Sequence, residues 1–163
     1  MQPQAPLFQL DDWMKVRGWT RENGGLVHQG GDFVLAPVEL STGNIQFTIR
    51  LRRGKRIEWV LGYRDPKNYY LFQIDETNLT RTEVIDGKHS KPFKIAHGLK
   101  RDGPNTFGVD LYGKGIATGV LRAGQWIQLD NFQPDGGPAA GQFGFHIPGR
   151  DQIQLDEFRI LAK

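Results

Sequence analysis

Two acidic residues, Glu58 and Asp110, are the first candidates for chemistry in this chain. Each lies between apolar residues in a segment that alternates polar and apolar positions. Hydrolysis of a glycosidic bond by two carboxylates needs them about 5 to 9.5 Å apart, a separation that neighbouring strands provide. We therefore predict Glu58 and Asp110 as a candidate catalytic pair, with Asp75 as an alternative partner for Glu58. Acids at such positions also serve purely structural roles.

The protonation state of Glu58 bears on the choice between catalysis and binding. A general acid must stay protonated near neutral pH, which burial or a nearby negative charge achieves. We expect Arg50 and Arg64 beside Glu58, and these cations would hold its carboxyl group ionised. An ionised Glu58 paired with arginine favours a role in binding over a role in catalysis.

Polar residues of the same parity are predicted to line one face of a sheet. Arginine, amide and carboxylate groups bind pairs of sugar hydroxyls, and an aromatic ring stacks on the apolar face of a sugar. The predicted substrate-binding residues are Arg50, Arg64, Tyr69, Gln73, Asp75 and His146. The alternative is that these residues form only the solvated side of an antiparallel sheet. An error of one residue in the register would invert the assignment.

The elements that position these side chains alternate with a period of two. Apolar residues occupy every second position from Asn44 to Arg53, from Ile57 to Tyr63 and from Tyr70 to Ile74. This pattern predicts three consecutive antiparallel strands that form a meander. Further strands are predicted at Phe33 to Leu40, Leu79 to Ile85, Phe93 to His97, Thr106 to Tyr112, Ile116 to Leu121, Gln125 to Asp130, Gln142 to His146 and Gln152 to Leu161. A short helical turn is expected near Asp11 to Lys15.

Length and composition place limits on the kind of protein. The 163 residues fit one domain, residues 1–163, and the 21 glycines and 9 prolines separate short strands, as in a β-sandwich or barrel. The sequence contains no run of about 18 apolar residues, so no membrane-spanning helix is predicted. The absence of cysteine excludes disulfides and thiolate chemistry. The charge of +3 does not indicate nucleic-acid binding, although the basic cluster from Arg50 to Arg56 has the chemistry to contact phosphates.

Metal ligands and tryptophans are the remaining candidates. The four histidines lack metal-ligand spacing, so no cofactor is predicted, but Asp130-Asn131 and Asp135-Gly136-Gly137 offer oxygen ligands for calcium. A turn-forming loop is the alternative role for these residues. Of the four tryptophans, Trp59 has core parity, and Trp126 is left open as a platform on which a sugar stacks.

Three segments carry a resemblance to a known superfamily. The hairpin Arg64-Asp65-Pro66-Lys67-Asn68-Tyr69-Tyr70 resembles the RDPxNYY hairpin of concanavalin A-like sandwiches, which include lectins, laminin G-like modules and glycoside hydrolases. The opening, with Trp13, Gly18-Trp19 and Asn23-Gly24-Gly25-Leu26-Val27, resembles that of the 3-keto-disaccharide hydrolase domain family. The closing segments, Gly141-Gln142-Phe143-Gly144-Phe145-His146 and Gln154 to Ile160, resemble the last strands of that family.

The resemblance implies an all-β fold, an antiparallel two-sheet β-sandwich of the concanavalin A-like jelly-roll type. It implies carbohydrate as the partner, bound on the concave sheet face, and it allows other domains in a longer protein. The Glu-x-Asp-x-x-Glu cluster of the laminarinase-type hydrolases is missing from this sequence. A glycoside-processing hydrolase and a laminin G-like interaction module are the alternatives. An extracellular or periplasmic location is favoured by the resemblance alone.

Overall fold

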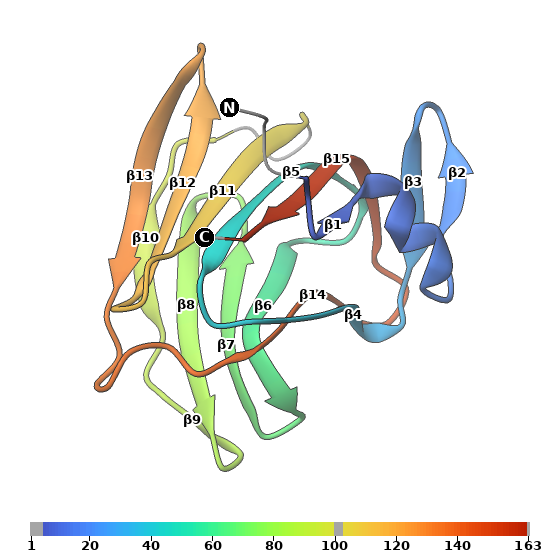
Figure 1. The fold of residues 1–163 in the computed structure, drawn as a ribbon. Helices are drawn as coiled ribbons and strands as arrows, with labels where there is room; N and C mark the ends of the chain where they lie inside the picture. Colours follow the sequence, from blue (N-terminus) through green and yellow to red (C-terminus); the bar gives the residue numbers. More distant parts are fainter. Residues whose placement is uncertain (1–4, 100–102, 163) are drawn as a thin grey trace.

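The computed structural model describes residues 5–99 and 103–162. Within these residues, fifteen strands form two antiparallel sheets that pack face to face (Figure 1). One 3₁₀ helix, η1 (Leu10–Lys15), follows the first strand. The predicted antiparallel two-sheet β-sandwich is confirmed. No helix in the described ranges is long and apolar enough to cross a membrane.

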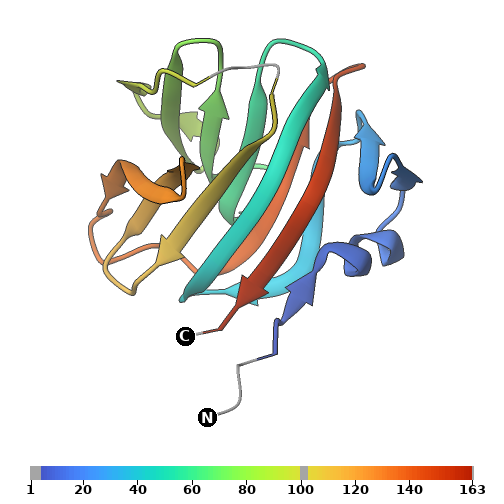
Figure 2. The ribbon, with the colours of Figure 1, turned by 90° about the horizontal axis from the view of Figure 1, so that it is seen from above.

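The first sheet, called sheet A below, contains eight strands in the described part of the chain. Its spatial order is β13-β12-β11-β5-β15-β3-β2, and β1 pairs with β15 outside this path. The bounds of these strands are β1 (Phe8–Gln9), β2 (Thr20–Glu22), β3 (Gly25–Gln29), β5 (Gly43–Arg53), β11 (Asn105–Leu111), β12 (Ile116–Arg122), β13 (Gln125–Phe132) and β15 (Gln152–Leu161). Figure 2 shows β11, β5 and β15 side by side across this sheet.

The second sheet, sheet B, contains seven strands among the described residues. Its order is β10-β8-β7-β6-β14-β4, and β9 pairs with β8. The bounds are β4 (Asp32–Leu40), β6 (Ile57–Asp65), β7 (Asn68–Ile74), β8 (Asn78–Ile85), β9 (Lys88–His89), β10 (Phe93–Ala96) and β14 (Gly141–Ile147).

The core lies between the two sheets and is rich in aromatic rings. Alternation along β5 turns Ile45, Phe47 and Ile49 inward, and all three are fully buried. The ring centre of Phe47 lies 5.3 Å from that of Trp59 on β6. This contact packs the two sheets against each other. Because β strands place every second side chain on one face, the residues between these positions point to solvent.

The predicted meander starts one strand too early. Strand β5 belongs to sheet A, whereas β6, β7 and β8 form the meander in sheet B. The link from Gly54 to Arg56 therefore crosses between the sheets. Alternation showed which residues face the core, but both sheets share that core, so parity could not assign a strand to one sheet.

A β-bulge changes the parity of β6 after Leu61. Gly62 adopts a left-handed φ of +57°, and the pairing with β7 shifts between Leu61 and Asp65. The ring of Tyr63 consequently packs 5.0 Å from Phe33 on the outer face of sheet B. The prediction that Arg64 shares a face with Glu58 is wrong for this reason, and Arg64 is exposed at the strand end. Bulges re-aim the side chains that follow them.

Candidate functional site

The predicted site residues divide between the two outer faces of the sandwich. Arg50 and Asp110 lie on strands of sheet A, and the other predicted residues lie on strands of sheet B or, for Asp75, at the end of one. The sheet B residues are Glu58, Arg64, Tyr69, Gln73, Asp75 and His146. Asp75 directly follows the last residue of β7.

The two predicted catalytic carboxylates lie on opposite faces. Glu58 lies between the core residues Ile57 and Trp59 of β6, and Asp110 lies between the core residues Val109 and Leu111 of β11. Both side chains therefore point away from the core, each from a different sheet. Since two packed sheets are about 10 Å apart before side chains are added, the pair does not act on one bond. The prediction of Glu58 and Asp110 as a joint catalytic pair is wrong.

A polar cluster on the outer face of sheet B is centred on Glu58, which is 5% exposed. The register places Glu58 opposite Gln73 on β7 and His146 on β14. The side-chain amide of Gln73 donates to Oε1 of Glu58 at 2.5 Å, and Nδ1 of His146 lies 3.3 Å from the same oxygen. Nε2 of His146 lies 2.9 Å from Oδ1 of Asp32. The structure thus brings together three of the predicted residues.

The charges in this cluster reinforce one another. Burial raises the pKa of Glu58, but hydrogen bonds with His146 and Gln73, together with the positive charges of His146 and Arg56, outweigh it and lower that pKa. The hydrogen bond with Glu58 and the negative charges of Glu58 and Asp32 raise the pKa of His146, against the effect of burial. Glu58 is therefore held ionised, which does not suit a general acid.

Aromatic rings cover one side of this polar cluster. The ring of Phe33 lies 4.7 Å from His146 and 5.1 Å from Tyr69, and the rings of Tyr63 and Tyr69 stack at 5.7 Å. Tyr69 was predicted to contact sugar, but part of its ring surface is occupied by these neighbours. Sequence reasoning missed Asp32, Phe33 and Tyr63, because only the pairing of β4 with β14 and the bulge in β6 place them here.

Two other predicted binding residues hold the fold together. The guanidinium of Arg50 donates through Nε and Nη2 to Oδ2 of Asp156, at 3.2 and 3.0 Å. Oδ1 of Asp75 accepts hydrogen bonds from the backbone N–H groups of Asn78 and Thr77, which lower the pKa of Asp75 and fix the turn after β7. Both side chains are thus engaged in contacts within the fold.

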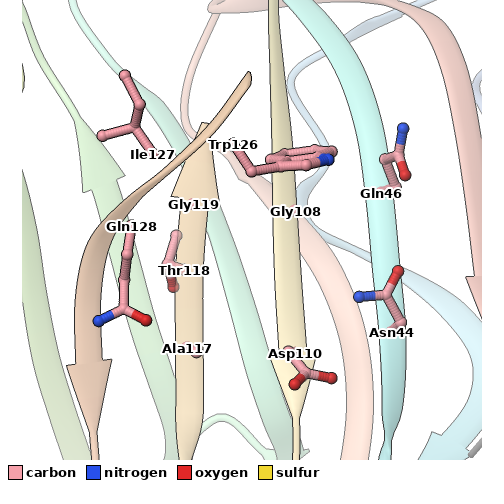
Figure 3. A pocket seen from close by; sticks show the side chains of 10 residues that line it. All are labelled: Asn44, Gln46, Gly108, Asp110, Ala117, Thr118, Gly119, Trp126, Ile127 and Gln128. Atoms are coloured by element: carbon pink, nitrogen blue, oxygen red, sulfur yellow. The ribbon is translucent and has the colours of Figure 1, made fainter. Parts of the chain in front are cut away.

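The outer face of sheet A contains a pocket of about 590 Å³ over strands β5, β11, β12 and β13 (Figure 3). Asp110 lies in this pocket, together with the amides of Asn44, Gln46 and Gln128. Oε1 of Gln46 accepts a hydrogen bond of 2.8 Å from Arg159 on β15, which fixes the orientation of this amide. The pocket thus combines a carboxylate with amide groups on one face.

Trp126 forms a wall of this pocket and is 50% exposed. Its side chain reaches from β13 across β12 to β11, and its ring is seen nearly edge-on, with Asn44 and Asp110 on one side of it (Figure 3). A Cβ atom at Gly108 would lie 2.9 Å from Cζ3 of the indole, closer than real contacts allow. The glycine in the middle of β11 therefore leaves room for the ring.

The other tryptophans are buried, so Trp126 is the only half-exposed one among the described residues. The sequence alone leaves its role as a platform open. A signal in the sequence that could have identified it is Gly108, a glycine between Phe107 and Val109 inside a strand, where glycine is otherwise unfavourable.

The predicted calcium ligands are largely engaged in other contacts. Asp130 is buried and forms an ion pair with Arg81 of β8, and Oδ1 of Asn131 accepts a hydrogen bond from the hydroxyl of Tyr112. Over the described ranges, no group of three or more His, Cys, Asp or Glu side chains is placed to hold a metal ion. Calcium binding near Asp135 stays a prediction.

Comparison with known proteins shows the fold. No family model matches the chain, and no curated protein sequence matches it. Carbohydrate-binding module CBM66 from Bacillus subtilis has a TM-score of 0.70 and 14% identity, over 88% of this chain and 91% of that one. The GH43 protein BlXynB from Bacillus licheniformis has a TM-score of 0.65 and 13% identity, over 90% of this chain but only 35% of that one.

A third similar structure is the galectin LEC-6 from Caenorhabditis elegans. It has a TM-score of 0.54 and 12% identity, over 79% of this chain and 93% of that one. The expected resemblance to concanavalin A-like sandwiches is confirmed as a likeness of fold. Membership of the 3-keto-disaccharide hydrolase family stays a prediction.

Proposed function

We propose that this chain is a carbohydrate-recognising domain that binds a glycan in the Trp126 pocket on the outer face of sheet A. The observation that carries the proposal is the half-exposed indole of Trp126 inside a pocket of about 590 Å³. An aromatic face packs against the apolar face of a sugar ring, and amide and carboxylate groups pair with its hydroxyls. Both kinds of group line this pocket.

The polar cluster on sheet B is a weaker candidate. Its members Glu58, Gln73 and His146 already pair with one another, and the rings of Phe33 and Tyr69 pack against each other. A ligand there would have to replace these contacts rather than fill an open volume. We therefore assign the primary site to the Trp126 pocket. Tyr69, Gln73 and His146 stay predicted contacts of a secondary surface.

The fold comparison supports the same conclusion. Two of the similar structures bear the names of a carbohydrate-binding module and a galectin. At 14% and 12% identity the likeness extends to the fold, so the site itself must carry the functional argument.

Neither alternative function receives comparable support. A two-carboxylate hydrolase would need a second acid beside Glu58 or Asp110 on the same face, with one of the two held protonated. Asp110 does not supply it for Glu58, and Asp32, which does lie in the Glu58 cluster, is engaged with His146 while Glu58 is held ionised. A laminin G-like protein-interaction module would present a broad surface, whereas the Trp126 pocket has the size of a small-ligand site.

A glycan array with the wild-type chain and two variants tests the proposal. We expect the Trp126→Ala variant to lose the wild-type signals by at least about tenfold, because buried aromatic anchors contribute about 2 kcal/mol or more. Ile85→Ala is the control, since Ile85 is a large apolar residue with 53% exposure outside the pocket. Equal signals from the wild type and Trp126→Ala would refute the assignment, and no signal from the wild type would refute the function. Running the array with and without calcium tests the metal prediction.

A further inference from the structure

We infer that the glycan site extends from the Trp126 pocket into a second subsite over β15 and β1. The ligand is then an extended, unbranched chain of neutral sugars that lies across the strands of sheet A. This inference rests on the proposed function and names the class of its ligand. The second subsite is a pocket of about 320 Å³, lined by Pro6, Gln9, Gln46, Glu157, Phe158 and Arg159. Gln46 also lines the Trp126 pocket, so the two pockets adjoin at this residue.

Residues paired across six neighbouring strands form one row through both pockets. Directly paired residues of antiparallel strands lie side by side, on a line that crosses the strands. In order from β1 to β13, the row is Gln9, Arg159, Gln46, Gly108, Gly119 and Gln128. Every residue of this row lines one of the two pockets or both. A chain that runs along the row therefore meets both pockets without a bend.

The indole of Trp126 directs a chain along this row. Its ring is seen nearly edge-on and extends from β12 over β11, with its nitrogen on the side of Gln46 (Figure 3). A sugar that stacks on the face of the ring beside Asn44 therefore lies alongside the row. The following units of a straight chain then reach Gln46 and Arg159, whereas a coiled chain turns away from the sheet.

The spacing of the strands sets the length of chain that reaches both subsites. Neighbouring strands lie about 4.8 Å apart, so Arg159 on β15 is about 10 Å from Gly108 on β11, which lies beneath the indole of Trp126. One unit of a β-1,4-linked sugar chain is about as long as one strand spacing, roughly 5 Å. One unit over Gln46 therefore separates the unit on Trp126 from the unit at Arg159, and about three units are needed to contact both.

The polar groups of the second subsite suit sugar hydroxyls. Nη2 of Arg159 donates to Oε1 of Gln46 at 2.8 Å, and no described residue accepts a hydrogen bond from the side-chain NH₂ of Gln46 or from the other nitrogens of Arg159. Oε2 of Glu157 accepts a hydrogen bond of 3.3 Å from the hydroxyl of Thr48, and its second oxygen is an open acceptor. A hydroxyl group both donates and accepts, so one neutral sugar can pair with Glu157 and Arg159. The opposite charges of these two exposed residues balance, and the subsite therefore favours neither an acidic nor a basic sugar.

Isothermal titration calorimetry with oligosaccharides of increasing length tests the inference. The probes are the dimers to hexamers of three β-1,4-linked series, the cello-, xylo- and manno-oligosaccharides, and the α-1,4-linked malto-oligosaccharides are their coiled counterpart. We expect at least one β-1,4-linked series to gain affinity with length. Its hexamer should bind at least about tenfold more tightly than its dimer, because the second subsite adds hydrogen bonds to charged groups. The malto-hexamer should bind no more tightly than the malto-dimer.

Variants separate the second subsite from the Trp126 pocket. Arg159→Ala, and Glu157→Ala, which leaves the contact between Arg159 and Gln46 in place, should each weaken hexamer binding at least about fivefold without a matching loss for the dimer. Trp126→Ala should weaken both lengths. Arg53→Ala is the matched control, because Arg53 is an exposed arginine of β5 that lines neither pocket.

The outcomes distinguish this inference from the proposed function. Equal affinity of dimer and hexamer, tightest binding by the malto series, or unchanged hexamer binding in both subsite variants would overturn the inference and leave a carbohydrate-binding function. Binding on the array of other glycans only, with none of these oligomers bound, would do the same. Absence of binding by every series, together with a blank glycan array, would overturn both.

Discussion

The indole ring of Trp126 occupies the space that a side chain at Gly108 would need. A Cβ atom built at Gly108 lies 2.9 Å from Cζ3 of this ring, and one built at Gly119 lies 3.8 Å from Cε3. Two glycines on neighbouring strands thus form a floor on which an aromatic residue from a third strand rests. The backbone of Gly108 does not require glycine, since its φ lies outside the left-handed region. Glycine is needed at this position because any side chain would collide with the indole ring of Trp126.

Replacing Gly108 by alanine should therefore reduce binding more than stability. The new methyl group displaces the indole, while alanine is about 0.5 to 1 kcal/mol better than glycine inside a strand, which offsets part of the strain. We expect glycan affinity to fall at least about fivefold, with a change of only a few degrees in Tm. Titration followed by tryptophan fluorescence and a thermal melt measure the two effects.

Gly103→Ala is the control for this substitution. An added Cβ at Gly103 meets nothing within 4 Å, and its φ is also outside the left-handed region. If Gly108→Ala binds as tightly as Gly103→Ala, the glycine floor has no part in positioning Trp126.

The pair of Glu58 and His146 should make stability depend on pH. The pKa of His146 is raised above its ordinary value of 6.5, so its stabilising effect is fully present below pH 6.5 and is lost as the pH rises through the raised value. The pKa of Glu58 is lowered below 4.5, so its effect is fully present above pH 4.5 and is lost as the pH falls through the lowered value. The pair therefore stabilises most between about pH 4.5 and 6.5.

Thermal melts from pH 3 to pH 9 check this dependence. The difference in Tm between the wild type and His146→Gln should be largest in that window and should shrink above it. A difference that grows steadily towards pH 9 would contradict the ion pair. The matched variant is His89→Gln, because His89 is exposed on the short strand β9.

The ion pair between Arg81 and Asp130 should be important for both stability and binding. Asp130 is buried on β13, and the guanidinium of Arg81 lies 4.0 Å from the ring centre of Phe132 and 4.7 Å from that of Phe93. Asp130→Ala leaves the guanidinium of Arg81, whose side chain is only 14% exposed, without its carboxylate, which costs about 3 to 5 kcal/mol. Because β13 also carries Trp126, glycan binding by Asp130→Ala should weaken together with its stability.

Urea denaturation of Asp130→Ala measures this loss of unfolding free energy, with Asp135→Ala in the adjacent loop as the control. A loss below about 1 kcal/mol would show that the pair contributes no more than an exposed salt bridge.

The aromatic core should be highly sensitive to truncation. Phe47 is fully buried, and its ring lies 5.3 Å from Trp59 and 5.4 Å from Phe145 on the opposite sheet. Phe47→Ala should lower the unfolding free energy by about 3 to 5 kcal/mol through lost burial and a new cavity. Ile85→Ala, at a position that is 53% exposed, should change it by less than about 0.5 kcal/mol in the same denaturation experiment. Similar losses in both variants would contradict this core.

Much of the fold could be predicted from the period-two pattern. The inward positions of Phe47, Trp59 and Phe107 follow from alternation alone, because a half-buried strand exposes every second residue. The assignment of β5 to sheet A could not be predicted, since the inner faces of both sheets are equally apolar. The bulge at Gly62 reversed the predicted side of Tyr63, and a single glycine in a strand does not reveal whether a bulge is present.

The candidate site was less predictable than the fold. The grouping of Glu58, Gln73 and His146 depends on parity within one sheet and was predicted, whereas the separation of Asp110 from Glu58 depends on which sheet each strand joins. The placement of Trp126 depends on a long-range contact with Gly108, across strand β12. Contacts of this kind follow from strand order, which alternation does not encode.

Nuclear magnetic resonance spectroscopy of the ¹⁵N-labelled chain, titrated with the glycan that binds most tightly on the array, tests the central claim most directly. The account predicts that the indole N–H signal of Trp126 and the side-chain amide signals of Asn44 and Gln46 shift with increasing glycan, while the indole signals of the buried tryptophans stay in place. Shifts of the Gln73 side-chain amide and the His146 ring, with an unchanged Trp126 signal, would place the binding site on sheet B and contradict the account.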